Sequence, residues 1–133
     1  NIIMNKDNAM WLKKIKYILS LKDKDLIKME SYSVIVSFIL SKEVFSHNSE
    51  LYEFMQKLKI TCKPYLLKSR ILLLGKAIRT LQMAETEEII DILEIINVKI
   101  NEIEEEKQEI PQVEKKKKDN YMKKMLDLYG RKE

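Results

Sequence analysis

The stretch PYLLKSRILLLGKAIRTLQM, residues 64–83, decides the fold that the sequence predicts. One set of its apolar residues recurs at alternating intervals of four and three, which places them on one face of an α-helix. That set is Leu67, Ile71, Leu74, Ile78 and Leu81. Other leucines fall on the remaining faces, and a helix that is apolar over most of its circumference is typical of a buried position. We therefore predict that residues 64–83 form the central helix, with Pro64 in its first turn.

The composition favours helices throughout the chain. Only 2 Gly and 2 Pro occur among 133 residues, and because these residues mark turns, an all-β protein with many tight connections is disfavoured. The length predicts one domain with a core of its own. Charged residues make up 35% of the chain, against roughly 25% in an average domain. We expect an all-α fold, a compact bundle of about five helices with solvated outer faces.

Three helices are predicted before the central one. The first can be capped by Asp7 or Asn8 and runs to about Ser20. The second follows the KDKD turn at residues 22–25 and ends near Phe45. The third helix can be capped by Asn48 or Ser49 and carries an apolar face as far as Leu58.

A strand is the alternative for part of the second helix. Residues 31–38, SYSVIVSF, alternate small polar and larger side chains and are rich in β-branching, which also favours a strand.

The last helix of the bundle is predicted at residues 86–109. It is broadly apolar in its first half, whereas glutamates dominate beyond Asn101. Such a helix is expected to pack in the bundle first and then to project outward, as in a coiled coil. The seam predicted for self-association consists of Leu93, Ile96, Ile100 and Ile103. No turn is forced before Thr86, so one long helix over residues 64–109 is the alternative.

A second unit is predicted after the bundle, which we place at residues 1–110. Pro111 and four consecutive lysines predict a solvated linker at residues 111–118. A short C-terminal helix at residues 119–133 then carries one apolar stripe. The stripe consists of Tyr121, Met122, Met125, Leu126 and Tyr129. Because so short a helix is unstable alone, it must dock on its own bundle, on a second copy or in a groove of a protein partner.

The charge is distributed in three blocks. Residues 1–84 carry a net +8, residues 85–109 a net −8 and residues 110–133 a net +4. Lysine and arginine on the central helix are candidates for contacts with nucleic acid, because they neutralise phosphates. These candidates are Lys68, Lys76 and Arg79. The other interpretation is a solvated face, or a partner for the acidic helix in a hairpin.

Catalysis is not predicted. The only histidine, His47, lies in a polar loop, and the only cysteine, Cys62, has no partner for a disulfide or a zinc site. Neither a glycine-rich phosphate loop nor a calcium loop is present, so we expect no cofactor and no metal. No apolar stretch approaches the roughly 20 residues of a membrane span. These features predict a soluble protein in a reducing compartment, the cytoplasm.

The sequence thus predicts a small non-catalytic helical regulator or adaptor. It would bind a protein partner through the C-terminal helix and self-associate through the acidic helix. The alternative is a nucleic-acid-binding accessory protein that uses the basic face and the lysine-rich tail.

Overall fold

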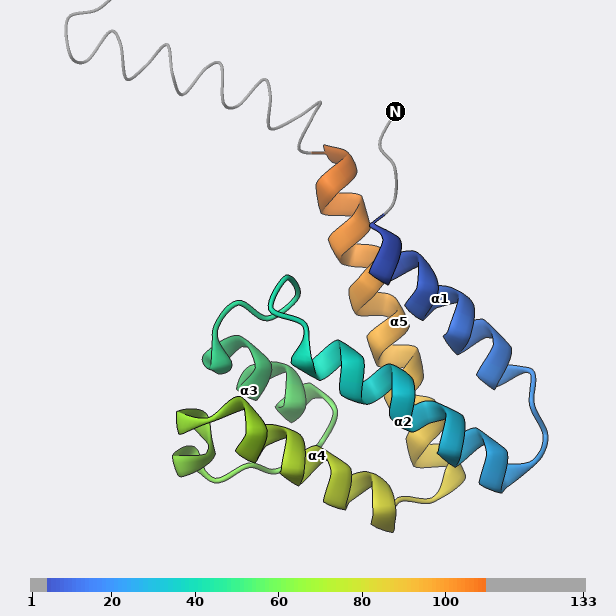
Figure 1. The fold of residues 1–133 in the computed structure, drawn as a ribbon, viewed down its shortest axis with the longest axis horizontal. Helices are drawn as coiled ribbons and strands as arrows, with labels where there is room; N and C mark the ends of the chain where they lie inside the picture. The colour runs from blue at the N-terminus through green and yellow to red at the C-terminus, as the bar shows by residue number, and fades with distance from the viewer. Residues whose placement is uncertain (1–4, 110–133) are drawn as a thin grey trace, which may run out of the picture.

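The computed structural model describes residues 5–109, and side chains as far as Lys107. Over these residues the protein is an all-α compact bundle without strands, as predicted (Figure 1). The elements are α1 (Lys6–Leu19), α2 (Lys24–Leu40), α3 (Asn48–Lys57), the 3-10 helix η1 (Pro64–Lys68), α4 (Arg70–Met83) and α5 (Thr86–Glu109). The predicted linker at 111–118 and C-terminal helix at 119–133 lie outside the described residues.

The centre of the bundle is α2, which packs against α1, α4 and α5 (Figure 1). The prediction of a central helix at residues 64–83 is therefore wrong, and so is the strand alternative for residues 31–38. Buried side chains occur around much of α2, at Ile27, Ser31, Val34, Ile35, Phe38 and Ile39. Contacts on three sides explain why β-branched residues form a helix here, because tertiary packing overrides intrinsic propensity. The helix ends at Leu40, earlier than predicted, and Phe45 belongs to the loop that follows.

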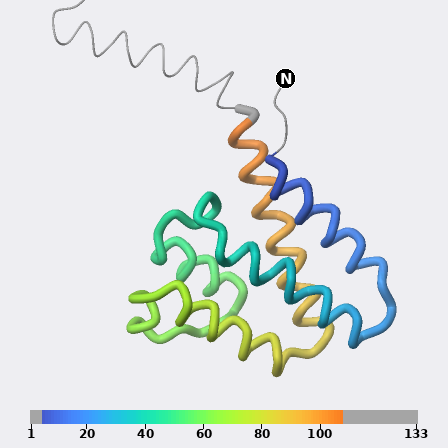
Figure 2. Tube along the Cα trace, in the orientation of Figure 1, coloured from blue at the N-terminus to red at the C-terminus, as the bar shows by residue number. Residues whose placement is uncertain are grey.

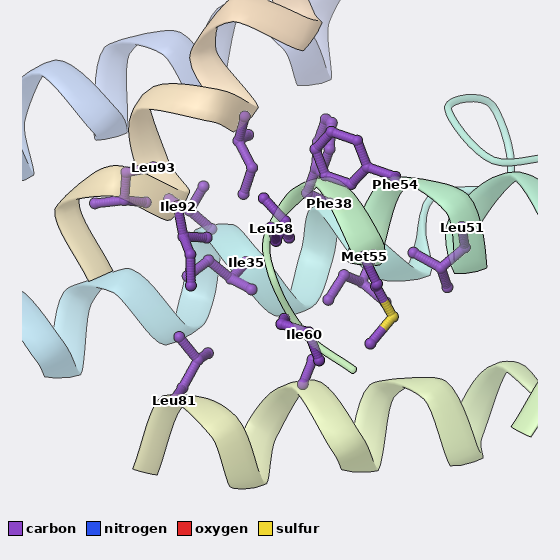
Figure 3. Close-up of a cluster of buried hydrophobic side chains, with 14 of the residues drawn as sticks. Ile35, Phe38, Leu51, Phe54, Met55, Leu58, Ile60, Leu81, Ile92 and Leu93 are labelled. Atoms are coloured by element: carbon purple, nitrogen blue, oxygen red, sulfur yellow. The ribbon is translucent and has the colours of Figure 1, made fainter. Parts of the chain in front are cut away.

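The aromatic residues of the core gather around Phe38 of α2. Its ring meets those of Trp11, Phe45 and Phe54 at centroid distances of 5.1, 5.4 and 5.7 Å respectively. The indole N–H of Trp11 also donates to the hydroxyl of Ser37 at 2.8 Å. The cluster joins α1, α2, the loop after α2, and α3; Figure 3 shows Phe38 and Phe54 within it.

Ser69 divides the segment that the sequence predicts as one helix. Its hydroxyl accepts from the backbone N–H groups of Ile71 and Leu72 at 3.2 and 3.4 Å, which begins α4 anew. The residues of α4 that are buried are Leu73, Ala77 and Leu81. Ile71, predicted for the core, is 67% exposed. The face of α4 that is buried therefore differs from the predicted one, and α4 lies at the side of the bundle.

Arg70 joins three helix ends. Its Nε donates to Oδ1 of Asn48 at 3.1 Å, and its Nη1 donates to the carbonyls of Ile39 and Ser41 at 3.5 and 3.4 Å. The amide of Asn48 donates in turn to the carbonyl of Leu67 at 3.1 Å. A cation at the last carbonyls of α2 is favourable, because that end of a helix carries partial negative charge. Arg70 therefore fixes the start of α4 against the end of α2 and the start of α3.

α4 and α5 are separate helices, so the alternative of one long helix is wrong. Ala84 and Glu85 connect them, and the Glu88 carboxylate accepts from the N–H of Glu85 at 2.7 Å. α5 then packs against α1 and α2. Asn8 of α1 donates its amide to Glu104, and both side chains are buried. The acidic helix thus stays in contact with α1 past Asn101, where the sequence predicts that it leaves the bundle.

Gly75 provides a test of the outward position of α4. Among the residues that the structure describes, a Cβ at this glycine would meet only the end of the Arg79 side chain, at 3.7 Å, so no close approach of another described helix requires glycine. We expect Gly75→Ala to raise the free energy of unfolding by about 0.5–1 kcal/mol in urea denaturation. The matched control, Ala77→Gly in the same helix, should lower it by at least as much. A loss of stability in Gly75→Ala would mean that a neighbour other than Arg79 fills this position.

The contact between Asn8 and Glu104 provides a second test. Asn8→Leu removes a donor from the buried Glu104 carboxylate, whose other oxygen, Oε1, has no hydrogen-bond partner among the described side chains. We expect a loss of about 1.5–3 kcal/mol, because a hydrogen bond to a buried charge is removed. The double variant Asn8→Leu, Glu104→Leu should lie within about 1 kcal/mol of the wild type, since apolar replacement of both partners is often neutral. Equal losses in the single and double variants would contradict this account.

Candidate functional site

A groove lies between α4 and α5. The two helices diverge from their short connection, because α4 packs against α2, α3 and η1 whereas α5 packs against α1 and α2 (Figure 2). The space between them, closed by the end of α3, has a volume of about 980 Å³. It is lined by the second half of α4, the first half of α5 and the residues Leu58 and Lys59. The groove is therefore a direct product of the way α4 is placed.

The floor of the groove is apolar. Leu58 and Ile92 are buried at its base, and Figure 3 labels both within the cluster of buried side chains. Two large apolar side chains at the sides are open to solvent: Met83 is 85% exposed and Val98 is 56% exposed. Burying such side chains against a partner yields about 25 cal/mol for each Å² of apolar surface. As far as residues 5–107 are concerned, the groove thus has exposed apolar surface.

Charges of opposite sign line the two sides of the groove. The basic residues Lys59, Lys76 and Arg79 come from the end of α3 and from α4. The acidic residues Glu88, Asp91 and Glu94 come from α5. Within residues 5–107 the salt bridges join other residues, Lys14 to Glu30 and Lys107 to Glu104, so the two charged sides do not neutralise each other by direct contact.

Lys59 is held in the groove by an unusual backbone conformation. Its φ of 64° is in the left-handed region, which costs a non-glycine residue about 1–2 kcal/mol. The conformation ends α3, because the N–H of Lys59 donates to Gln56 at 3.0 Å and the N–H of Ile60 donates to Met55 at 2.9 Å. The same turn carries Ile60 into the core and leaves Lys59 exposed.

The structure separates the residues predicted to contact nucleic acid. Lys76 and Arg79 line the groove, whereas Lys68 ends η1 and is not part of the groove lining. Glu88 and Asp91 share the groove with Lys76 and Arg79. A phosphate chain would therefore meet both signs of charge.

The predicted self-association seam lies largely in the core of a single chain. Leu93, Ile96 and Ile100 are fully buried there, and Ile103 is partly buried. Their surface is already used within the bundle. The tail stripe Tyr121, Met122, Met125, Leu126 and Tyr129 lies outside the described residues.

Sequence reasoning missed the apolar residues of the groove. Met83 and Val98 each stand beside a helical stripe rather than in it, and periodicity alone assigns such residues to a solvated face. The spacing of residues 76, 79 and 83 places them on one face of α4. The burial of Leu73, Ala77 and Leu81 against the bundle turns that face outward, and this packing cannot be read from the pattern of one helix.

The polar residues near His47 have a structural role. The Glu50 carboxylate accepts from the backbone N–H of His47 and from the hydroxyl of Ser46, both at 3.0 Å. These hydrogen bonds, first of all that from His47, lower the pKa of Glu50. The arrangement caps α3, because it satisfies a free N–H at the helix start. It replaces the predicted caps Asn48 and Ser49.

Another groove, of about 1200 Å³, lies between α1 and α2. Apolar side chains such as Met10, Tyr17 and Leu40 line it. Its charged lining residues are Lys13, Lys14, Lys42, Asp7 and Glu43. The charge is therefore net basic, and opposite signs are not divided between two sides as they are between α4 and α5.

Comparison with protein-family models, curated proteins and solved structures found no match. Among the helices of residues 5–109, none combines the length and the apolar character that a membrane crossing requires. The same residues contain no group of three or more His, Cys, Asp or Glu side chains that could hold a metal ion.

Cys62 gives a test of the electrostatics beside the groove. Burial raises the pKa of its thiol, and the nearby Lys76 opposes that rise. We expect alkylation by iodoacetamide at pH 8 to be about tenfold slower in the folded chain than in urea, because the thiolate is the reacting form. Lys76→Met should move the pH profile of alkylation in the folded chain to higher pH, since it removes the opposing cation. An unchanged profile would show that Lys76 does not act on the thiol.

Proposed function

We propose that the protein is a small non-catalytic adaptor that binds an amphipathic helix of a protein partner in the groove between α4 and α5. The observation that carries the proposal is the exposure of Met83 and Val98 beside an apolar floor. Isolated exposed apolar residues are common on protein surfaces, but exposed apolar residues that line one concave site with an apolar floor are typical of a binding surface.

The shape and charge of the groove support a helix as the bound element. The groove runs between two helices, and along α5 from Glu88 to Val98 it is about 15 Å long at 1.5 Å per residue. That length accommodates about ten residues of a partner helix, enough for anchors at positions i, i+4 and i+7. The acidic side on α5 and the basic side on α4 would orient the partner, because complementary charges fix register.

Nucleic acid is the alternative partner, through Lys76, Arg79 and Lys68. The acidic residues that share the groove with two of these basic residues weigh against it, because they repel phosphates. If duplex binding did occur, it would have to weaken steeply as salt is raised. Protein binding is the function that the groove geometry supports better.

Photocrosslinking tests the adaptor proposal. A photoreactive amino acid at Met83 places the probe in the groove, and the same amino acid at Met29, which is 70% exposed on α2, is the matched control. In cells of the native host we expect one protein to be captured from position 83 and not from position 29. Mass spectrometry of the captured segment should show apolar residues at helical spacing.

A substitution in the groove then tests whether the capture is specific. With the probe at Met83, Val98→Glu should lower the yield by about tenfold, which corresponds to 1.4 kcal/mol of binding free energy. Met29→Glu, the same change on another face, should leave the yield unchanged. Equal capture from positions 83 and 29, or a captured segment without helical periodicity, would contradict the proposal.

A further inference from the structure

The C-terminal segment of this chain has the dimensions of the groove between α4 and α5. Its predicted stripe, from Tyr121 to Tyr129, would be about 12 Å long as a helix at 1.5 Å per residue. The groove extends about 15 Å along α5 between Glu88 and Val98. Methionine and tyrosine, which make up most of the stripe, adapt well to apolar grooves.

The chain is long enough to bring this segment back to the groove. α5 ends at Glu109, about 16 Å along the helix from Val98 and about 32 Å from Glu88. Residues 110–120 can span about 36 Å when extended. A helix at 121–129 can therefore lie antiparallel to α5 over the whole groove. Neither a second copy nor a rearrangement of the bundle is needed.

Charge favours this groove over the groove between α1 and α2. Residues 110–133 carry a net +4, of which the linker part, 110–118, contributes +3 and the docking segment, 119–133, contributes +1. The charged lining of the α4–α5 groove sums to zero, with its acidic residues Glu88, Asp91 and Glu94 together on α5. The charged lining of the α1–α2 groove is net basic, with Lys13, Lys14 and Lys42 against Asp7 and Glu43. A basic linker that returns along α5 is attracted by the acidic side of the first groove, whereas the second groove opposes it.

We propose that residues 119–133 dock as a helix in the groove between α4 and α5 of the same chain. The free protein thus covers its own binding surface, and Met83 and Val98 become buried against the tail stripe. A tether of this length gives an effective concentration on the order of millimolar. A partner that uses the groove must therefore displace the tail, which makes the adaptor self-inhibited.

Intramolecular photocrosslinking of the purified full chain tests this docking. A photoreactive amino acid at Val98 should crosslink to a residue within 119–133 of the same chain, identified by mass spectrometry. The same probe at Met29 should give no such product. Crosslinks from Val98 only to a second chain, or to no residue of 119–133, would overturn the proposal.

Two variant pairs, each checked for helix content by circular dichroism, establish how the tail is held. Met125→Asp with Leu126→Asp should lower the crosslink yield from Val98 by about tenfold. Asp127→Asn, on the other side of the predicted tail helix, should leave the yield unchanged. Asp91→Lys with Glu94→Lys should lower the yield as well, while Asp7→Lys with Glu43→Lys in the other groove should not. If the Met125→Asp, Leu126→Asp variant and its control Asp127→Asn gave equal yields, docking by the stripe would be overturned. If the Asp91→Lys, Glu94→Lys variant and its control Asp7→Lys, Glu43→Lys gave equal yields, attraction by the acidic side of the groove would be overturned.

The two proposals can fail independently. Intramolecular docking is measured on purified protein without a partner, whereas capture from Met83 is measured in cells. A tail crosslink without a cellular partner would leave the docking in place and remove the adaptor function. Capture of a partner without a tail crosslink would support the adaptor function and overturn the docking of the tail.

Discussion

The fold depends on the packing around the ring of Phe38. All three phenylalanines and the single tryptophan of the chain meet there, and each is buried. Aromatic pairs such as the edge-on contacts of Phe38 with Trp11 and Phe45 contribute about 0.5–1.5 kcal/mol each beyond the burial of their surface. Because the four rings come from α1, α2, α3 and the loop before α3, their contact fixes the first half of the bundle. α4 and α5 each pack against α2, which carries Phe38.

The sequence predicts the number and order of the helices well, but not which of them is central. Periodicity reports that a helix has an apolar face, and it does not report how many neighbours that face will meet. α2 meets three other helices although residues 31–38 resemble a strand. The segment with the strongest helical pattern, residues 64–83, lies at the side. Its division follows from the hydroxyl of Ser69, a local capping signal that competes with the apolar pattern.

The groove between α4 and α5 is harder to predict from the sequence than the helices are, because it depends on how two helices are placed. Lys76 and Arg79 are recognisable as basic residues of one helix, but the acidic residues that face them come from the next helix. The opposition of charge exists only because α4 and α5 diverge after Ala84. Leu93 and Ile100, which the sequence predicts for self-association, are buried in the core of one chain. A pattern in one helix can identify a face, whereas a groove requires the angle between two helices.

The junction at Arg70 has a consequence for how the molecule opens. One guanidinium group bonds to groups at the end of α2 and the start of α3, and Asn48 extends the connection to the end of η1. Fraying of any of these termini therefore removes hydrogen bonds from the others. Amides around this junction should exchange with solvent as one cooperative unit rather than separately. Breathing of this unit would loosen the anchored end of α4, at the opposite end of the helix from Met83.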